Sequence, residues 1–196
     1  LAQAFILQRD PGSALQYLDR VLKLDPGDTI ALTMTAHATV LNGSPQKARE
    51  YLDRIKTPNN PIVLSVKANS FFAEGNYAEA LRYIDTVLTI DPDDYVAKSF
   101  KAMVLRASGD LPAAEAILQE LIAQRPDDDV VICNLVRVFL ARGDRRAAMQ
   151  LLIARTQKPP IHFLTLALFT KCFPRNSDIW TTMRTALGQA IITKAK

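Results

Sequence analysis

Hydrophobic side chains recur along the chain with the period of an α-helix, in short segments that glycine or proline residues separate. Between residues 61 and 160 these segments come in pairs, of which the first ends at a glycine and the second ends before a proline. No stretch combines the alternating pattern of a β-strand with an Asn-Gly type hairpin turn. The pattern therefore predicts an all-α chain built from pairs of short helices.

The helix pairs repeat at a fixed interval of 34 residues. Because three independent columns of residues keep this one period, the repetition indicates a solenoid of stacked helical hairpins. The columns are Pro92, Pro126 and Pro160; Gly75, Gly109 and Gly143; and Ala80, Ala114 and Ala148.

Each column has a physical role. A glycine near the end of the first helix can adopt the left-handed conformation that closes the helix. The polar residue after it, which is Asn76, Asp110 or Asp144, is expected to accept hydrogen bonds from the next helix. A small residue in the alanine column lets the two helices of a hairpin cross closely. Proline ends the second helix, and the acidic residues at 93–94 and 127–129 favour the amino end of the helix that follows.

This pattern resembles the tetratricopeptide repeat, a 34-residue helical hairpin with small residues at positions 8 and 20 and proline at position 32. The fifth unit departs from the pattern, because it has Val136 at the first small position and Arg145 where an aromatic residue is usual. The resemblance implies a right-handed helical-hairpin solenoid. Its best match is the third unit, with Leu64, Ala68, Phe71, Tyr77, Ala80, Ile84, Val87 and Pro92.

On that resemblance the chain divides into five repeat units and a C-terminal segment. The second unit has only 32 residues, because two are missing from the end of its second helix, where residues 57–61 replace the usual stop. The first unit begins inside its first helix, so we expect the natural protein to continue upstream of Leu1. The units are 1–28 (partial), 29–60 (short), 61–94, 95–128 and 129–162, followed by a capping helix pair in 161–196.

The C-terminal segment is expected to close the solenoid. Residues 161–173 are apolar on nearly every side, as in a helix that lies between neighbours. We expect a last helix to cover it with a stripe formed by Trp180, Met183, Leu187 and Ile191. The alternative is that this stripe docks on another protomer, which would make a homo-oligomer through the C-terminal helices, or on a missing domain.

The charge distribution bears on partners and location. The formal net charge is +4, and residues 145–196 carry nine lysines or arginines against one acid, Asp178. This basic end either meets an acidic partner or is a solvated surface. A nucleic-acid binder is disfavoured, since the basic residues are not interleaved with exposed aromatic side chains. Without an apolar run long enough for a membrane span, we expect a cytoplasmic location, and a periplasmic one stays open because the start of the chain is missing.

Residues suited to catalysis or metal binding are not grouped. His37 and His162 lie in different units, and we expect Cys133 and Cys172 to be thiols rather than a disulfide. There is no glycine-rich phosphate loop and no nucleophile with a neighbouring base. We therefore expect no enzymatic activity, no cofactor, no metal and no small-molecule substrate.

The resemblance implies a concave groove lined by the first helices of the units. Arg106 and Arg137 would suit a peptide with an acidic feature at one end. The cations that would grip the terminal carboxylate of a chaperone are missing, so binding of a chaperone tail is disfavoured. Each candidate contact has the alternative of being merely solvated. The candidates are Thr33, His37, Ser65, Asn69, Phe72, Ser99, Met103, Arg106, Cys133 and Arg137.

The sequence therefore favours a protein-protein interaction scaffold that binds a peptide or protein segment in this groove. The alternative is an accessory repeat segment of a larger enzyme or of a bacterial envelope or secretion assembly machine.

Overall fold

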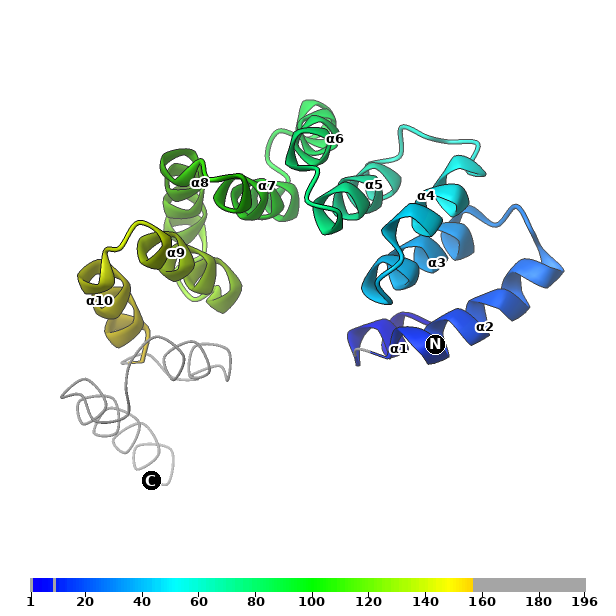
Figure 1. Cartoon of the computed structure of the whole chain (residues 1–196), viewed down its shortest axis with the longest axis horizontal. Helices are drawn as coiled ribbons and strands as arrows, with labels where there is room; N and C mark the ends of the chain where they lie inside the picture. The colour runs from blue at the N-terminus through cyan, green and yellow to red at the C-terminus, as the bar shows by residue number, and fades with distance from the viewer. Residues whose placement is uncertain (1, 9, 157–196) are drawn as a thin grey trace, which may run out of the picture. The chain divides into compact units, whose positions relative to one another are not determined.

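The computed structural model describes residues 2–8 and 10–156, and this part of the chain contains ten helices and no strand (Figure 1). The all-α prediction is confirmed. The expected capping helices, including Trp180, Met183, Leu187 and Ile191, lie outside the described residues. The helices are α1 (Ala2–Leu7), α2 (Pro11–Leu24), α3 (Thr29–Leu41), α4 (Pro45–Asp53), α5 (Pro61–Ala73), α6 (Tyr77–Ile90), α7 (Tyr95–Ser108), α8 (Leu111–Gln124), α9 (Asp129–Ala141) and α10 (Arg145–Thr156).

The chain forms two compact units, Leu1–Ser108 with α1 to α7 and Gly109–Lys196 with α8 to α10. In the first unit each helix from α1 to α4 packs on the next, as do α4 to α7, and α3 also packs on α5. In the second unit α9 packs on both α8 and α10. Within each of the two units, each helix thus contacts its neighbours in sequence, which is the arrangement of a hairpin solenoid.

The first helix of each hairpin is capped by the residue just before it. Asp28 Oδ1 accepts hydrogen bonds from the backbone N–H groups of Ile30 and Ala31, at 2.8 and 3.0 Å. Asp94 and Asp128 make the same pair of bonds in front of α7 and α9. These bonds satisfy amide groups that have no partner inside the helix. The prediction that the acidic residues behind the prolines favour the next helix is confirmed.

The second helices are capped in a similar way. Asn76, Asp110 and Asp144 each accept a hydrogen bond from the N–H group three residues ahead, at 3.3, 3.2 and 3.0 Å. Before each of them the glycine at 75, 109 or 143 has a φ of +78°, +96° or +84°. A Cβ atom at these glycines would meet nothing within 4 Å, so glycine is favoured there by backbone conformation alone. Both predictions for the turn are confirmed.

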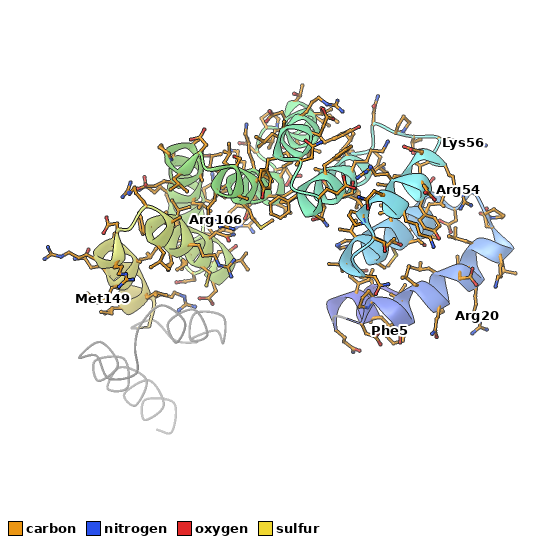
Figure 2. The ribbon with its side chains drawn as sticks, in the orientation of Figure 1. Phe5, Arg20, Arg54, Lys56, Arg106 and Met149 are labelled. Carbon is orange, nitrogen blue, oxygen red and sulfur yellow. The ribbon has the colours of Figure 1, made fainter. Side chains whose placement is uncertain are left out.

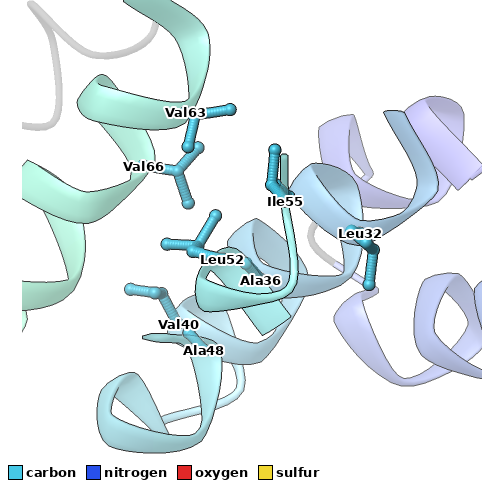
Figure 3. Close-up of a cluster of buried hydrophobic side chains, with 8 residues drawn as sticks. All are labelled: Leu32, Ala36, Val40, Ala48, Leu52, Ile55, Val63 and Val66. Carbon is cyan, nitrogen blue, oxygen red and sulfur yellow. The ribbon is translucent and has the colours of Figure 1, made fainter. Parts of the chain in front are cut away.

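The alanine column lies at the centre of the hairpins. Ala80, Ala114 and Ala148 are completely buried, and the larger Val136 is accommodated at the first small position of the fifth unit with 0% exposure. Around the equivalent Ala48, side chains from three helices form one hydrophobic cluster (Figure 3). This cluster joins α3, α4 and α5 through Leu32, Ala36, Val40, Ala48, Leu52, Ile55, Val63 and Val66.

Ion pairs recur at matching places between successive hairpins of the first unit. Lys67 of α5 pairs with Asp53 of α4 at 3.1 Å, and Lys101 of α7 pairs with Asp85 of α6 at 2.7 Å. Both lysines occupy the seventh place of a first helix. Since one member of each pair is more than half exposed, each contributes about 1 kcal/mol or less to stability.

A second kind of ion pair is found in both compact units. The acidic and the basic residue have exchanged positions between the two examples. Arg49 of α4 pairs with Glu74 at the end of α5 at 2.8 Å, whereas Glu115 of α8 pairs with Arg142 at the end of α9 at 2.7 Å. Each arginine also lies over a phenylalanine ring, 4.5 Å from the centroid of Phe71 for Arg49 and 5.6 Å for Arg142 over the ring at 139. The ion pair and the ring contact are therefore present in both places, although the arginine and the glutamate have exchanged helices.

The short second repeat unit, residues 29–60, differs from its prediction in one respect. The missing residues predict a helix α4 that is two residues shorter, but α4 has nine residues where α6 and α8 have fourteen. After Asp53 the backbone N–H groups of Arg54 and Ile55 donate to carbonyl oxygens three residues back, at 3.3 and 3.2 Å, so the α-helical bonding pattern ends there. Ile55 nevertheless keeps its core position, with 6% exposure. Arg54, at the end of α4, donates from Nη2 to the carbonyl oxygen of Pro26 at 2.8 Å (Figure 2).

Candidate functional site

One face of the first helices in the first unit exposes aliphatic side chains at a fixed place. Ile30, Ile62 and Val96 stand second in α3, α5 and α7 and are 72%, 67% and 75% exposed. The backbone N–H group of each of these residues donates a hydrogen bond to the residue that caps its helix. The three side chains therefore leave the backbone at equivalent points of their helices. The recurrence of a branched apolar residue in an exposed place is not explained by packing within the unit.

Residues three and seven places further along each helix, and ten places further on α5 and α7, lie on the same face as these aliphatic residues. We call this surface the first-helix face. In the first unit it consists of Ile30, Thr33 and His37 from α3, Ile62, Ser65, Asn69 and Phe72 from α5, and Val96, Ser99, Met103 and Arg106 from α7.

The face is hollowed at its start by a cavity of about 380 Å³. The cavity lies between α1, α3 and α5, and the side chains that line it in the described part of the chain include no lysine, arginine, aspartate or glutamate. Its walls are mainly aliphatic. The lining residues are Gln3, Ile6, Thr29, Ile30, Thr33, Met34, His37, Asn60, Ile62, Val63 and Val66.

Of the sequence-predicted contacts, Thr33 and His37 are brought together in this cavity. Thr33 is 7% exposed, and its hydroxyl donates to the carbonyl oxygen of Thr29 at 2.7 Å, so its proton is used within the helix. Burial lowers the pKa of His37, because a charged imidazolium loses hydration there. The imidazole is therefore neutral near pH 7, and the cavity has no net charge.

The predicted contacts on α5 lie next to this cavity along the same face. Ser65 donates its hydroxyl proton to the carbonyl oxygen of Pro61 at 2.8 Å, while Asn69 is half-buried. Phe72 packs edge-on against Phe100 of α7, with the ring centroids 5.7 Å apart. Phe72 therefore joins α5 to α7 as well as standing on the first-helix face.

On α7 the predicted contacts Ser99, Met103 and Arg106 are all half-buried. Arg106 is the cation of this face in the described part of the first unit (Figure 2). The remaining predicted contacts lie on α9 of the second unit. There Cys133 is 5% exposed, whereas Arg137 is exposed and contacts Asn134 Oδ1 at 3.4 Å through Nη1.

Sequence reasoning missed much of the cavity wall. Val63 and Val66 are buried and belong to the hydrophobic cluster of Figure 3, so their apolar spacing indicates core and gives no sign of a cavity. Gln3 and Ile6 come from α1, whose place beside α3 depends on tertiary packing. The available signal was the repeated aliphatic residue at the second position of each first helix.

Other kinds of site receive no support from the described residues. They contain no group of three or more His, Cys, Asp or Glu side chains that could hold a metal ion. Within the same residues, no helix has the length and apolar character needed to cross a membrane.

Comparison with known sequences decides the family. Models of the tetratricopeptide repeat match residues 1–61, 71–131 and 105–160. The chain belongs to the tetratricopeptide repeat family. A search of curated proteins found no match. Tetratricopeptide repeats generally serve as non-catalytic scaffolds for protein interactions, so the fold supports a scaffold role in general terms.

Solved tetratricopeptide repeat structures share the fold at low sequence identity. TTC0263, a thermophilic protein of this family from Thermus thermophilus, is 18% identical, with 88% of this chain and 95% of that chain covered and a TM-score of 0.77. MamA from Desulfovibrio magneticus RS-1 is 17% identical, with coverage of 90% and 93% and a TM-score of 0.62. YrrB, whose structure is described as having an unusual peptide-binding site, is 18% identical, with coverage of 85% and 87% and a TM-score of 0.58. The predicted helical-hairpin solenoid is confirmed by these likenesses.

Proposed function

We propose that this tetratricopeptide repeat protein is a scaffold that binds a peptide or protein segment along the first-helix face. The observation that carries the proposal is the row formed by Ile30, Ile62 and Val96, each at least 67% exposed at the same place of its helix. Single exposed aliphatic residues are ordinary on protein surfaces. A row of them beside a hollow is typical of a binding surface, because contact with a partner removes the apolar area from water.

Polar side chains stand beside this row and can recognise a main chain. The Asn69 amide has two donors and an acceptor, and the Ser99 hydroxyl can donate and accept. An extended or helical segment on this face would meet apolar and hydrogen-bonding groups in alternation. The peptide-binding site named for YrrB, which shares the fold, is consistent with this use.

Arginine would add selectivity at the far end of the face. Arg106 on α7 would attract an acidic group of the partner, because a guanidinium matches a carboxylate in shape and charge. On the second unit, the exposed Arg137 of α9 would make the corresponding contact for a partner bound to that unit, while Cys133 is too buried to take part.

The proposal is tested with a random peptide library displayed on phage and selected on the whole chain. The dissociation constant of the best peptide is then measured by calorimetry for the parent chain, Asn69→Lys and Ser99→Lys. We expect each variant to weaken binding by about tenfold or more, because a long cation would stand in the path of the segment. The matched control is Thr86→Lys on α6, where the parent side chain is exposed and lies off this face.

A peptide that loses affinity through Thr86→Lys but not through either face variant would contradict the proposal. Circular dichroism of each variant checks that the helices are retained.

A further inference from the structure

The cavity at the start of the first-helix face differs from the rest of that face in two ways. It is a hollow lined by three helices, and its lining is free of charged side chains over the described residues. At about 380 Å³ it lies within the range of about 300–1,000 Å³ that is usual for ligand pockets. It is therefore large enough to take an inserted side chain rather than a water molecule alone.

Two polar side chains of the cavity have hydrogen-bond partners within the protein. The Thr33 hydroxyl donates to Thr29, and Asn60 Oδ1 accepts from the N–H group of Ile62 at 2.9 Å. A charged side chain entering here would leave water without finding an opposite charge among the lining residues. An aliphatic or aromatic side chain would instead replace water on Ile30, Ile62 and Met34 at no such cost.

We infer that the cavity between α1, α3 and α5 is an anchor site for one uncharged, apolar side chain of a bound peptide, and that it rejects acidic and basic side chains. The inference rests on the proposed function, since it specifies the partner chemistry of the same face. Charge complementarity argues for this occupant, because an uncharged lining matches an uncharged ligand.

The ligand is a peptide rather than an isolated apolar molecule because the aliphatic row continues past the cavity. Ile30 and Ile62 line its rim, and Val96 stands at the same helical place on α7, outside the cavity. A ligand that uses the whole row needs apolar groups at intervals along an elongated backbone. His37 stands among the lining residues as a neutral hydrogen-bonding group that can meet an amide of that backbone.

The anchor site is tested by NMR titration of the whole chain with single capped amino acids. The apolar probes are N-acetyl-leucinamide and N-acetyl-phenylalaninamide, and the charged probes are N-acetyl-aspartamide with its free side-chain carboxylate and N-acetyl-lysinamide. We expect the apolar probes to shift the methyl signals of Ile30, Val63 and Val66 with dissociation constants of about 1–10 mM. The charged probes should bind about tenfold more weakly or not at all.

A pair of matched variants ties the binding to the cavity. Ile62→Asp places a carboxylate on the rim at a residue that is 67% exposed, so the fold is retained while the apolar probes lose about tenfold or more in affinity. Ile90→Asp makes the same replacement at an exposed isoleucine of α6 that is outside this cavity, and it should leave the titration unchanged.

Three results would overturn the inference. They are equal shifts by charged and apolar probes, the absence of any shift, and shifts by the apolar probes that Ile62→Asp leaves unchanged. If one of these results were obtained while the affinity of library-selected peptides still depended on Asn69 and Ser99, the anchor site would be wrong and the proposed function would be retained. If the selected peptides bound outside the first-helix face, both the anchor site and the proposed function would be wrong.

Discussion

The first helices α3 and α9 have the same length and the same kind of cap but different side chains at matching positions. Each has thirteen residues, and the capping aspartate of each accepts from the second and third N–H groups of its helix. At matching positions of the face, however, α3 has Thr33 and His37 where α9 has Cys133 and Arg137. The comparison teaches that caps, glycines and buried alanines are kept between hairpins while the face residues vary, as the proposed binding role of that face requires.

The hairpins that contain these helices also differ at the end opposite the turn. In the α9–α10 hairpin Arg155 makes two bonds to the Asp129 carboxylate, from Nε at 2.8 Å and from Nη2 at 3.0 Å. Most of each side chain is removed from solvent, with exposures of 5% for Arg155 and 13% for Asp129. The matching residues of the α3–α4 hairpin are Thr29 and Ile55, which form no ion pair. One hairpin has an ion pair at this end, and the other has a buried isoleucine that belongs to the hydrophobic cluster of Figure 3.

Breaking the buried ion pair should have the largest effect. Arg155→Ile leaves the Asp129 carboxylate buried without this partner and should lower the free energy of unfolding by about 3–5 kcal/mol. The double variant Arg155→Ile with Asp129→Thr copies the α3–α4 hairpin and should recover most of that loss. Urea unfolding followed by circular dichroism measures both. If the double variant were as unstable as the single one, the two arrangements at this end of a hairpin would not be interchangeable.

The shared framework predicts equal core penalties in the two hairpins. Leu52 of α4 and Leu152 of α10 occupy the same place and are 1% and 0% exposed. Leu52→Ala and Leu152→Ala should each cost about 2–5 kcal/mol through lost burial and the cavity left behind. Hydrogen exchange should locate the first loss in α3 to α5 and the second in α9 and α10. A penalty at one site that is several times the other would show that the frameworks are not equivalent.

A smaller and again equal penalty is expected at the turns. Gly43 and Gly143 have φ values of +82° and +84°, and a Cβ atom at either would meet nothing within 4 Å. Gly43→Ala and Gly143→Ala should therefore each cost about 1–2 kcal/mol, from the left-handed backbone alone. Asparagine, which tolerates this conformation better, serves as the control at each site. Thermal unfolding of the four variants measures the difference, and an alanine variant as stable as the parent would contradict the expectation.

The smallest effect concerns pH and separates His37 from its counterpart Arg137. Burial lowers the pKa of His37 in the folded chain below its ordinary value of 6.5. As pH falls below 6.5, the unfolded chain takes up a proton before the folded chain does, so the stability of the first unit declines. The parent should lose more stability than His37→Gln between pH 7.5 and 5.5. If the free energy of unfolding changed equally with pH in the two proteins, the imidazole of His37 would not be protected from protonation.

Much of the fold follows from local rules that a sequence displays. The glycine at 75 and the capping side chain of Asn76 act within a few residues, so their positions and conformations could be predicted. The pair of Lys67 and Asp53 could not, because it depends on how two hairpins stack. The early end of α4 was underestimated because the count of residues in a repeat does not report where the backbone leaves the helix.

The candidate site was predictable only in part. Helical spacing places Thr33 and His37 on one face, and the structure puts both in one cavity. Spacing alone does not show that Val66 is both core and cavity wall, or that Ile6 of α1 closes the other side. Those facts depend on packing between helices that are distant in sequence.

The most direct test of the account is to map a bound peptide on the whole chain by ¹⁵N–¹H correlation spectra. A peptide selected from the phage library is titrated, and the backbone signals that move are assigned. The account predicts movement at Ile30, His37, Ile62 and Asn69, with little change in the second helices α2, α4 and α6. A bound peptide that moves the signals of α2, α4 or α6 and leaves α3 and α5 unchanged would contradict it.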